Sequence, residues 1–179
     1  VHIAHVSSPD SVDISFAKKF TKEVTPHHII LNKNSPIGSL GKVNPPLRSE
    51  HVSKILFKYL SIGLIDIVAS DHSPHTIEEK ENFNDAPSGL PNVETTLPLL
   101  LMEFKRGNIK LERIINAVSE KPGEFLKINK GKIEIGYDAD FVIFRLSSEK
   151  KIKSKNLHYK CGWTPYENMD AIFPDYVFI

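Results

Sequence analysis

Residues 64–70 constrain the fold more than any other stretch of the sequence. They are nearly continuously apolar and rich in β-branched side chains. A short strand of this kind is typical of a parallel sheet that helices cover on both faces. Asp71 and His72 follow it directly. Because side chains at the carboxyl ends of parallel strands meet at one face of such a fold, we expect this end of the strand to carry function.

Three strand-and-helix units run along the first two thirds of the chain. The predicted strands cover residues 1–6, 23–31 and 64–70, and the predicted helices cover 10–21, 50–61 and 93–106, with shorter helices over 111–118 and 122–126. Ser8 and Ser49 stand where helix N-caps are expected. Three units do not close a barrel, so the pattern predicts an α/β fold that forms the second half of a (β/α)8 barrel.

After Gly131 the hydrophobic pattern changes from helical to alternating. Residues 132–136 and 140–144 predict a hairpin, and residues 176–179 predict a strand whose partner lies outside the chain. We therefore expect two parts, the half barrel over residues 1–130 and a small β unit over residues 131–179.

Composition excludes several classes of protein. Lys and Arg number 23 against 22 Asp and Glu, a net charge of +1, which argues against a nucleic-acid surface. Cys161 is the only cysteine, so no intrachain disulfide or Cys-x-x-Cys metal site can form, and a reducing, cytoplasmic compartment is expected. No apolar run is long enough to span a bilayer, and no export signal opens the chain, so neither a membrane nor a nucleic acid is an expected partner.

The candidate catalytic residues lie at two strand ends. Asp71 is followed within four residues by His72 and His75, a grouping that suits metal or acid–base chemistry; an Asp that caps the next turn, with histidines bonded to backbone, is an equally good reading of these residues alone. His5 ends the first strand and taken alone resembles a core histidine. Both ends would face one barrel mouth, which favours a zinc site with nitrogen and carboxylate ligands. His2 would point to the other face.

Two loops are candidate binding segments. Residues 42–48 hold Asn44 and two prolines, and residues 86–92 hold Ser88 and Gly89, which allows close backbone approach. An ordinary surface turn explains each loop as well. His27 and His28 are adjacent on a predicted strand, so at most one of them could be a ligand. We assign no chemistry to Cys161 or Trp163.

Taken together these segments resemble the dihydroorotases, cyclic amidohydrolases of pyrimidine biosynthesis. The matching pieces, in order, are His-Val-Ser-Ser from His5, Glu-Val-Thr-Pro-His-His from Glu23, Lys-Val-Asn-Pro-Pro-Leu-Arg from Lys42, Ala-Ser-Asp-His-Ser-Pro-His-Thr from Ala69, Pro-Ser-Gly-Leu-Pro-Asn-Val-Glu-Thr from Pro87 and Gly-Tyr-Asp-Ala-Asp from Gly136. They cover nearly the whole chain, and their combination is specific.

The resemblance implies a TIM (β/α)8 barrel with a small β-sandwich and one or two zinc ions. It makes His5 a metal ligand, Asp71 both a metal ligand and the catalytic base, and Asn44, His75, Ser88 and Gly89 substrate contacts. It gives His27 and His28 no metal role. The family's His-x-His pair and its other ligands are absent from the sequence. The chain thus resembles the C-terminal portion from the sixth barrel strand onward, with the remaining zinc ligands outside it, and it would need the missing N-terminal half.

The expected reaction is the reversible cyclisation of N-carbamoyl-L-aspartate to L-dihydroorotate, in the de novo pathway to UMP. Two alternatives stay open: another cyclic amidohydrolase (a dihydropyrimidinase, hydantoinase or allantoinase), or a non-catalytic dihydroorotase-like scaffold subunit. Expected partners are the small-molecule substrate, a second copy in a homodimer and aspartate carbamoyltransferase.

Overall fold

The computed structural model describes all residues, 1–179, and its N-terminal part is built on three parallel strands. These are β1 (His2–Ile3), β2 (Thr21–Val24) and β3 (Ile67–Val68), in the order β1-β2-β3. The parallel pairing continues beyond the last residues of β1 and β3, because Val6 N donates to Glu23 O and Ala69 N donates to Val24 O. All three strands therefore end at one edge of the sheet, as predicted.

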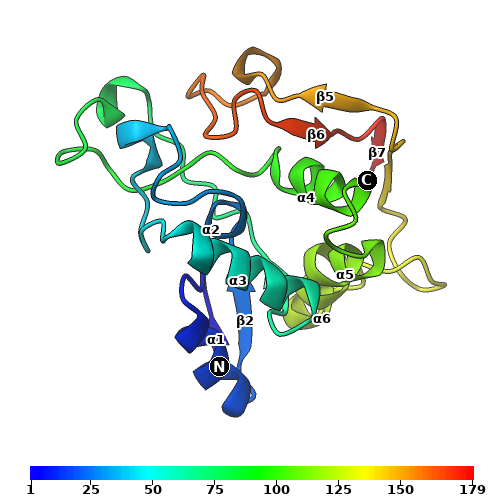
Figure 1. Ribbon diagram of the computed structural model, residues 1–179. Coiled ribbons are helices and arrows are strands. Elements are labelled where there is room, and N and C mark those ends of the chain that lie inside the picture. Colours follow the sequence, from blue (N-terminus) through cyan, green and yellow to red (C-terminus); the bar gives the residue numbers. More distant parts are fainter.

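Helices connect these strands and cover the sheet (Figure 1). They are α1 (Pro9–Ala17), α2 (Pro26–Ile30) and α3 (Glu50–Ser61). The Ser8 side chain accepts a bond from Ser11 N, and the Ser49 side chain accepts one from Val52 N, so both predicted N-caps are confirmed. The predicted bounds of α3 are confirmed as well.

The main hydrophobic core joins the sheet to its helices. It contains Val6, Val12, Val24, Ile29, Leu56, Leu60, Ile65, Val68, Leu100, Ile109, Ile114 and Ala117. Arg113 reaches in from α5 (Leu111–Ile115): its Nε donates to Leu60 O at 2.8 Å and its guanidinium also donates to Asp66 O at 3.2 Å. Arg113 thus connects α5 to the end of α3 and to the residues just before β3.

The prediction of extended structure over residues 23–31 is wrong beyond Val24. Pro26 begins a helix, because its fixed φ suits the first helical position, and His28 N donates to Thr25 O. The two histidines therefore lie on a helix, where adjacent side chains are not forced to opposite faces of a sheet.

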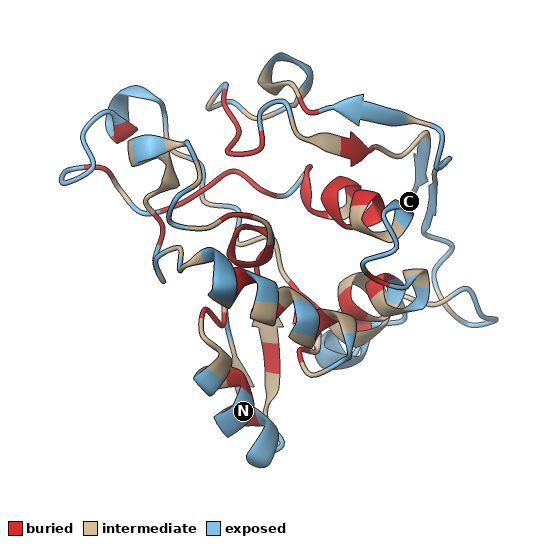
Figure 2. Cartoon of the chain, in the orientation of Figure 1, coloured by how far each residue is buried: buried red, intermediate tan, exposed pale blue.

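The helices α4 (Thr96–Lys105) and α6 (Lys121–Leu126) complete the helical part, with a π-helical turn over Asn116–Glu120 between α5 and α6. Pro98 lies in the first turn of α4, as the sequence requires. Figure 2 shows α4 largely in red, and its residues Pro98–Met102 are buried. No helix combines the length and the apolar character that a bilayer crossing requires.

The C-terminal part forms two antiparallel pairs, one of which lies against α4 (Figure 1). Strand β4 (Phe141–Ile143) pairs with β7 (Tyr176–Phe178), and β5 (Glu149–Lys151) pairs with β6 (Asp170–Ile172). The predicted hairpin between residues 132–136 and 140–144 is therefore wrong. So is the prediction that the last strand lacks a partner within the chain. Aromatic and β-branched residues of β4 face their like on β7, which favours this distant pairing.

Candidate active site at the carboxyl edge of the sheet

His5 and Asp71 both lie just beyond the carboxyl ends of their strands, and both have a left-handed backbone. Their φ angles are 38° and 47°. Non-glycine residues seldom adopt such angles, and strain of this kind is concentrated at functional sites. Both side chains are half-buried. The structure thus places the two predicted metal ligands at the same edge, each on a constrained backbone.

Helix α2 brings His27 to this edge. Its side chain is fully buried, and its Nε2 lies 4.0 Å from Asp71 Oδ2. That Nε2 is the one buried side-chain nitrogen or oxygen in the chain without a hydrogen-bond partner. Burial, with the nearby charges of His28 and His5, lowers the pKa of His27 to about 2. A neutral imidazole therefore faces the Asp71 carboxylate.

His28 has a different environment from its neighbour. Its Nδ1 lies 2.7 Å from Thr25 Oγ1 and its Nε2 donates to Pro45 O at 3.0 Å. Burial lowers its pKa to about 4, against the opposing effect of the Pro45 carbonyl. His28 thus fastens α2 to the loop that carries Asn44.

Backbone contacts join the loops that carry the predicted substrate contacts. Gly89 N donates to Lys42 O at 3.1 Å, and Ser73 N donates to Leu90 O at 3.0 Å. At Gly89 the φ angle is 151°, and a Cβ there would lie 2.3 Å from Ser73 O. Only glycine allows the two loops to come this close.

Lys80 holds the same loops with a buried charge. Its side chain has no exposed surface, and Nζ donates to the carbonyls of Lys42, Pro87 and Gly89 at 2.9, 3.0 and 2.9 Å. Burial and the neighbouring Lys42 lower the pKa of Lys80 to about 8. Three carbonyl acceptors offset the cost of burying the ammonium.

The predicted substrate contacts lie around this centre with different exposures. Asn44 and Ser88 are exposed and Gly89 is buried, while His75 is half-buried with Nδ1 3.6 Å from Glu79 Oε2. Trp163 of the C-terminal part donates from Nε1 to His75 O at 2.7 Å. The loops of these residues are thus brought together by Lys80, Gly89 and Trp163.

Within the chain, no group of three or more His, Cys, Asp or Glu side chains is arranged to hold a metal ion. His5 and Asp71 supply one imidazole and one carboxylate, which are ligand types that zinc accepts. The unpartnered Nε2 of His27 shows that this edge is polar and incompletely satisfied. The residues present therefore fit part of a zinc site and would need further ligands to complete it.

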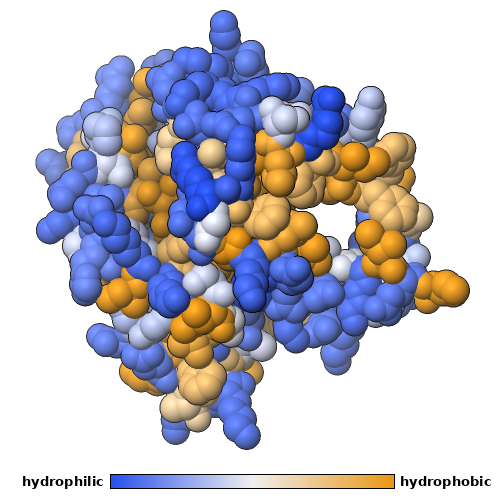
Figure 3. Space-filling view, turned by 45° about the vertical axis from the view of Figure 1, so that its right-hand side comes forward, coloured by the Kyte–Doolittle hydropathy of each residue, from blue (hydrophilic) through white to orange (hydrophobic).

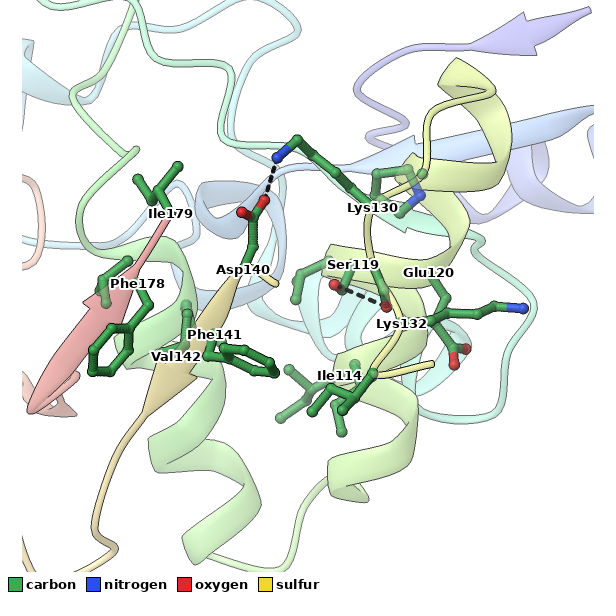
Figure 4. Close-up of a pocket in the computed structure, with 18 of the residues that line it drawn as sticks. Ile114, Ser119, Glu120, Lys130, Lys132, Asp140, Phe141, Val142, Phe178 and Ile179 are labelled. Carbon is green, nitrogen blue, oxygen red and sulfur yellow. Dashed lines mark hydrogen bonds and ion pairs between the residues drawn. The ribbon is translucent and has the colours of Figure 1, made fainter. Parts of the chain in front are cut away.

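A large hollow lies away from this edge. It has a volume of about 700 Å³ and lies between α5, α6 and the β4–β7 pair. Figure 3 shows hydrophobic side chains gathered beside an opening on this face. Figure 4 shows Lys130 directed to Asp140, and the Ser119 hydroxyl donates to Gly131 O. It holds none of the predicted site residues, so it is not the candidate active site.

The sequence did not reveal four residues that organise the site. His27, Lys80, Asn92 and Tyr166 all stand in segments that the sequence marks, but none of the four was given a role. Asn92 is buried and bonds both His27 and Tyr166. No local pattern marks these contacts, because the partners of Asn92 lie 65 and 74 residues away in the sequence.

Comparisons with known proteins show the family of the chain. The amidohydrolase family pattern matches residues 2–175. The chain is 45% identical to the dihydroorotase of Thermoplasma volcanium, over 98% of this chain and 41% of that one, and 43% identical to the dihydroorotase of Halobacterium salinarum, over 97% and 42%.

Among solved structures, an L-hydantoinase (dihydropyrimidinase) from Arthrobacter aurescens matches with a TM-score of 0.94 and 30% identity, over 99% of this chain and 43% of that one. A D-hydantoinase (dihydropyrimidinase) from Thermus sp. matches with a TM-score of 0.93 and 28% identity, over 99% and 43%. The chain spans about two fifths of the length of the curated relatives it matches. The family and these structures imply a TIM-barrel-type fold, and the chain belongs to the amidohydrolase family.

Proposed function

We propose that this chain is the C-terminal part of a zinc-dependent dihydroorotase. The observation that carries the proposal is the meeting of His5, His27 and Asp71 at one edge of the parallel sheet, in a chain that is 45% identical to a dihydroorotase. The proposed reaction is the reversible closure of N-carbamoyl-L-aspartate to L-dihydroorotate. A cytoplasmic location, a homodimer and an association with aspartate carbamoyltransferase stay predictions.

In the proposed mechanism, His5 and Asp71 would hold zinc together with ligands from outside the chain. The bound ion would polarise the amide carbonyl and make water more acidic. In ring opening, the Asp71 carboxylate takes a proton from the attacking water. It then delivers that proton to the ring nitrogen as the C–N bond breaks. Ring closure runs the same transfers in reverse.

The substrate would be held by the loops around this centre. Asn44 offers an amide that can donate and accept hydrogen bonds, and His75 offers a second polar contact. Ser88 and Gly89 present backbone that Lys80 keeps in place. Because Gly89 has no Cβ, a flat ring can approach the main chain closely.

The test uses the complete protein that contains this chain. Hydrolysis of L-dihydroorotate should exceed hydrolysis of dihydrouracil, hydantoin and allantoin. Asp71→Asn keeps the side-chain size but cannot act as a base, so turnover should fall by about 10²–10⁴. Asp66→Asn is the matched control, because Asp66 lies at the other end of the same strand and bonds Lys22. Near-normal turnover in Asp71→Asn would remove Asp71 from the mechanism.

A hydantoinase is the second candidate, because the solved structures with TM-scores of 0.93 and 0.94 carry that name. Their identity to this chain, 28% and 30%, is lower than the 45% of the dihydroorotase from Thermoplasma volcanium. Faster turnover of hydantoin or dihydrouracil than of dihydroorotate would favour this candidate. Absence of turnover on all of these substrates, in a complete protein that binds no zinc, would favour the scaffold alternative.

A further inference from the structure

Hydrogen bonds that run from Tyr166 through Asn92 to His27 determine which nitrogen of the His27 imidazole carries the hydrogen. Asn92 Nδ2 lies 3.0 Å from His27 Nδ1 and also donates to Leu90 O at 3.4 Å. A carbonyl accepts only, so the atom that faces it must be the amide nitrogen. Tyr166 OH completes the arrangement by donating to Asn92 Oδ1 at 2.7 Å. Asn92 is fully buried, so water cannot take over these contacts.

The tautomer of His27 follows from this orientation. Since Asn92 Nδ2 is a donor, His27 Nδ1 must accept and therefore carries no hydrogen. An imidazole whose Nδ1 accepts a hydrogen bond carries at most one ring hydrogen and is therefore neutral. Its one ring hydrogen therefore lies on Nε2, the atom that is 4.0 Å from Asp71 Oδ2 and has no other partner.

A protonated Nε2 has no free lone pair for a metal ion, so this arrangement does not suit a ligand role. It suits a donor directed at one oxygen of the Asp71 carboxylate. Catalytic hydrogen bonds are often long in a ligand-free structure and tighten in the working complex. A donor on Oδ2 would fix the plane of the carboxylate and leave Oδ1 for the reaction.

We propose that His27 is a positioning residue that orients the Asp71 carboxylate through its Nε2–H, and that Asn92 and Tyr166 fix the tautomer required for this. The inference rests on the proposed function, since Asp71 is the proposed base. It adds a relay that begins in the C-terminal part at Tyr166 and ends at the carboxylate. The contacts run from the Tyr166 hydroxyl to the Asn92 amide, from that amide to the His27 imidazole, and from the imidazole to the Asp71 carboxylate.

The first test reads the tautomer in the complete wild-type protein with bound zinc. Nitrogen NMR of histidine-labelled protein should show a protonated Nε2 and an unprotonated Nδ1 for His27. The His27→Gln variant identifies the signals by their loss. A protonated Nδ1, or two protonated nitrogens, would overturn the proposal. This reading does not depend on turnover, so it stands apart from the proposed function.

The second test compares kinetics and zinc content in the complete protein. His27→Leu should lower kcat by about 10–100-fold, the usual effect of losing a residue that orients a metal-site ligand, with KM little changed. His27→Gln should recover most of kcat, because its amide can still donate. Zinc content should stay at the wild-type level in His27→Gln. Zinc loss in step with activity, or wild-type kcat in His27→Leu, would overturn the proposal.

The relay is tested by two matched tyrosine variants. Tyr166→Phe removes the hydroxyl on Asn92 and should lower kcat in the same way, by a smaller factor. Tyr159→Phe removes a hydroxyl that bonds Glu94 N at 2.8 Å and does not contact Asn92, so kcat should stay near the wild-type value. Equal kcat loss in the two variants would overturn the relay. Failure of wild-type protein to turn over dihydroorotate would instead overturn the proposed function.

Discussion

Replacement of Lys80 by methionine should loosen the loop that carries Ser88 and Gly89. Lys80 Nζ donates to three carbonyls, of which two belong to that loop and the third belongs to Lys42. Methionine keeps a long apolar stem but donates no hydrogen bond. The loop should therefore open more often, while the rest of the fold stays intact.

The free-energy cost of Lys80→Met depends on which of the three carbonyls can accept a hydrogen bond from another donor. Lys42 O keeps the bond from Gly89 N at 3.1 Å. The carbonyl of buried Gly89 is left unsatisfied, which costs about 1–3 kcal/mol, whereas water can reach half-buried Pro87. The hydrogen bonds of Lys80 are also stronger than neutral ones because their donor is charged, and the substitution removes them. Opening of the loop should therefore become easier by about 3 kcal/mol in total. Since about 1.4 kcal/mol is a factor of ten, the open population should rise by about 10²-fold.

Limited proteolysis of the complete protein measures this opening at residues 81–88. When opening and closing are fast, the cleavage rate follows the open population, so Lys80→Met should be cleaved about 10²-fold faster. Lys42→Met is the matched control, because its Nζ donates to Asn84 O on the surface; its rate should change by less than about threefold. Unchanged cleavage in Lys80→Met, or an equal increase in Lys42→Met, would refute the reasoning.

Three further predictions concern stability of the complete protein, measured by urea unfolding. Gly89→Ala should cost about 3 kcal/mol, because the new Cβ would lie 2.3 Å from Ser73 O. Gly107→Ala should cost only about 1 kcal/mol, because nothing lies within 4 Å of its Cβ position; equal losses would contradict the close-contact argument. His28 has a folded pKa of about 4 against 6.5, so the unfolded chain binds its proton first. Below pH 6.5 this residue should therefore lower stability by about 1.4 kcal/mol for each pH unit, down to about pH 4. His28→Gln should remove this part of the slope and leave the part that comes from buried His27, whose pKa is about 2. Arg113→Lys should lower the free energy of unfolding by about 2 kcal/mol, because the single ammonium of lysine cannot replace a guanidinium that donates to both Leu60 O and Asp66 O. An unchanged urea midpoint would contradict this.

How far the sequence predicts the structure depends on the range of the interactions. The bounds of α3 were predicted fully, because Ser49 and the apolar spacing that define it are all local. His5 and Asp71 were placed at one edge because parallel strands end together. The pairing of residues 140–144 was predicted wrongly, since their partner in β7 lies more than 30 residues along the chain. Lys80 was missed, because one of its acceptors, Lys42 O, lies 38 residues away.

The contacts that link the C-terminal part to the site also determine when the site can form. Trp163 reaches His75 across 88 residues, and Tyr166 reaches Asn92 across 74. Contacts of such separation form late in folding, because closing a long loop costs entropy before the contact is gained. During synthesis the chain emerges from its N-terminus, so His27 and Asp71 leave the ribosome well before Tyr166. The strand ends that carry the chemistry are thus made early, and the tautomer of His27 can be fixed only after Tyr166 has left the ribosome.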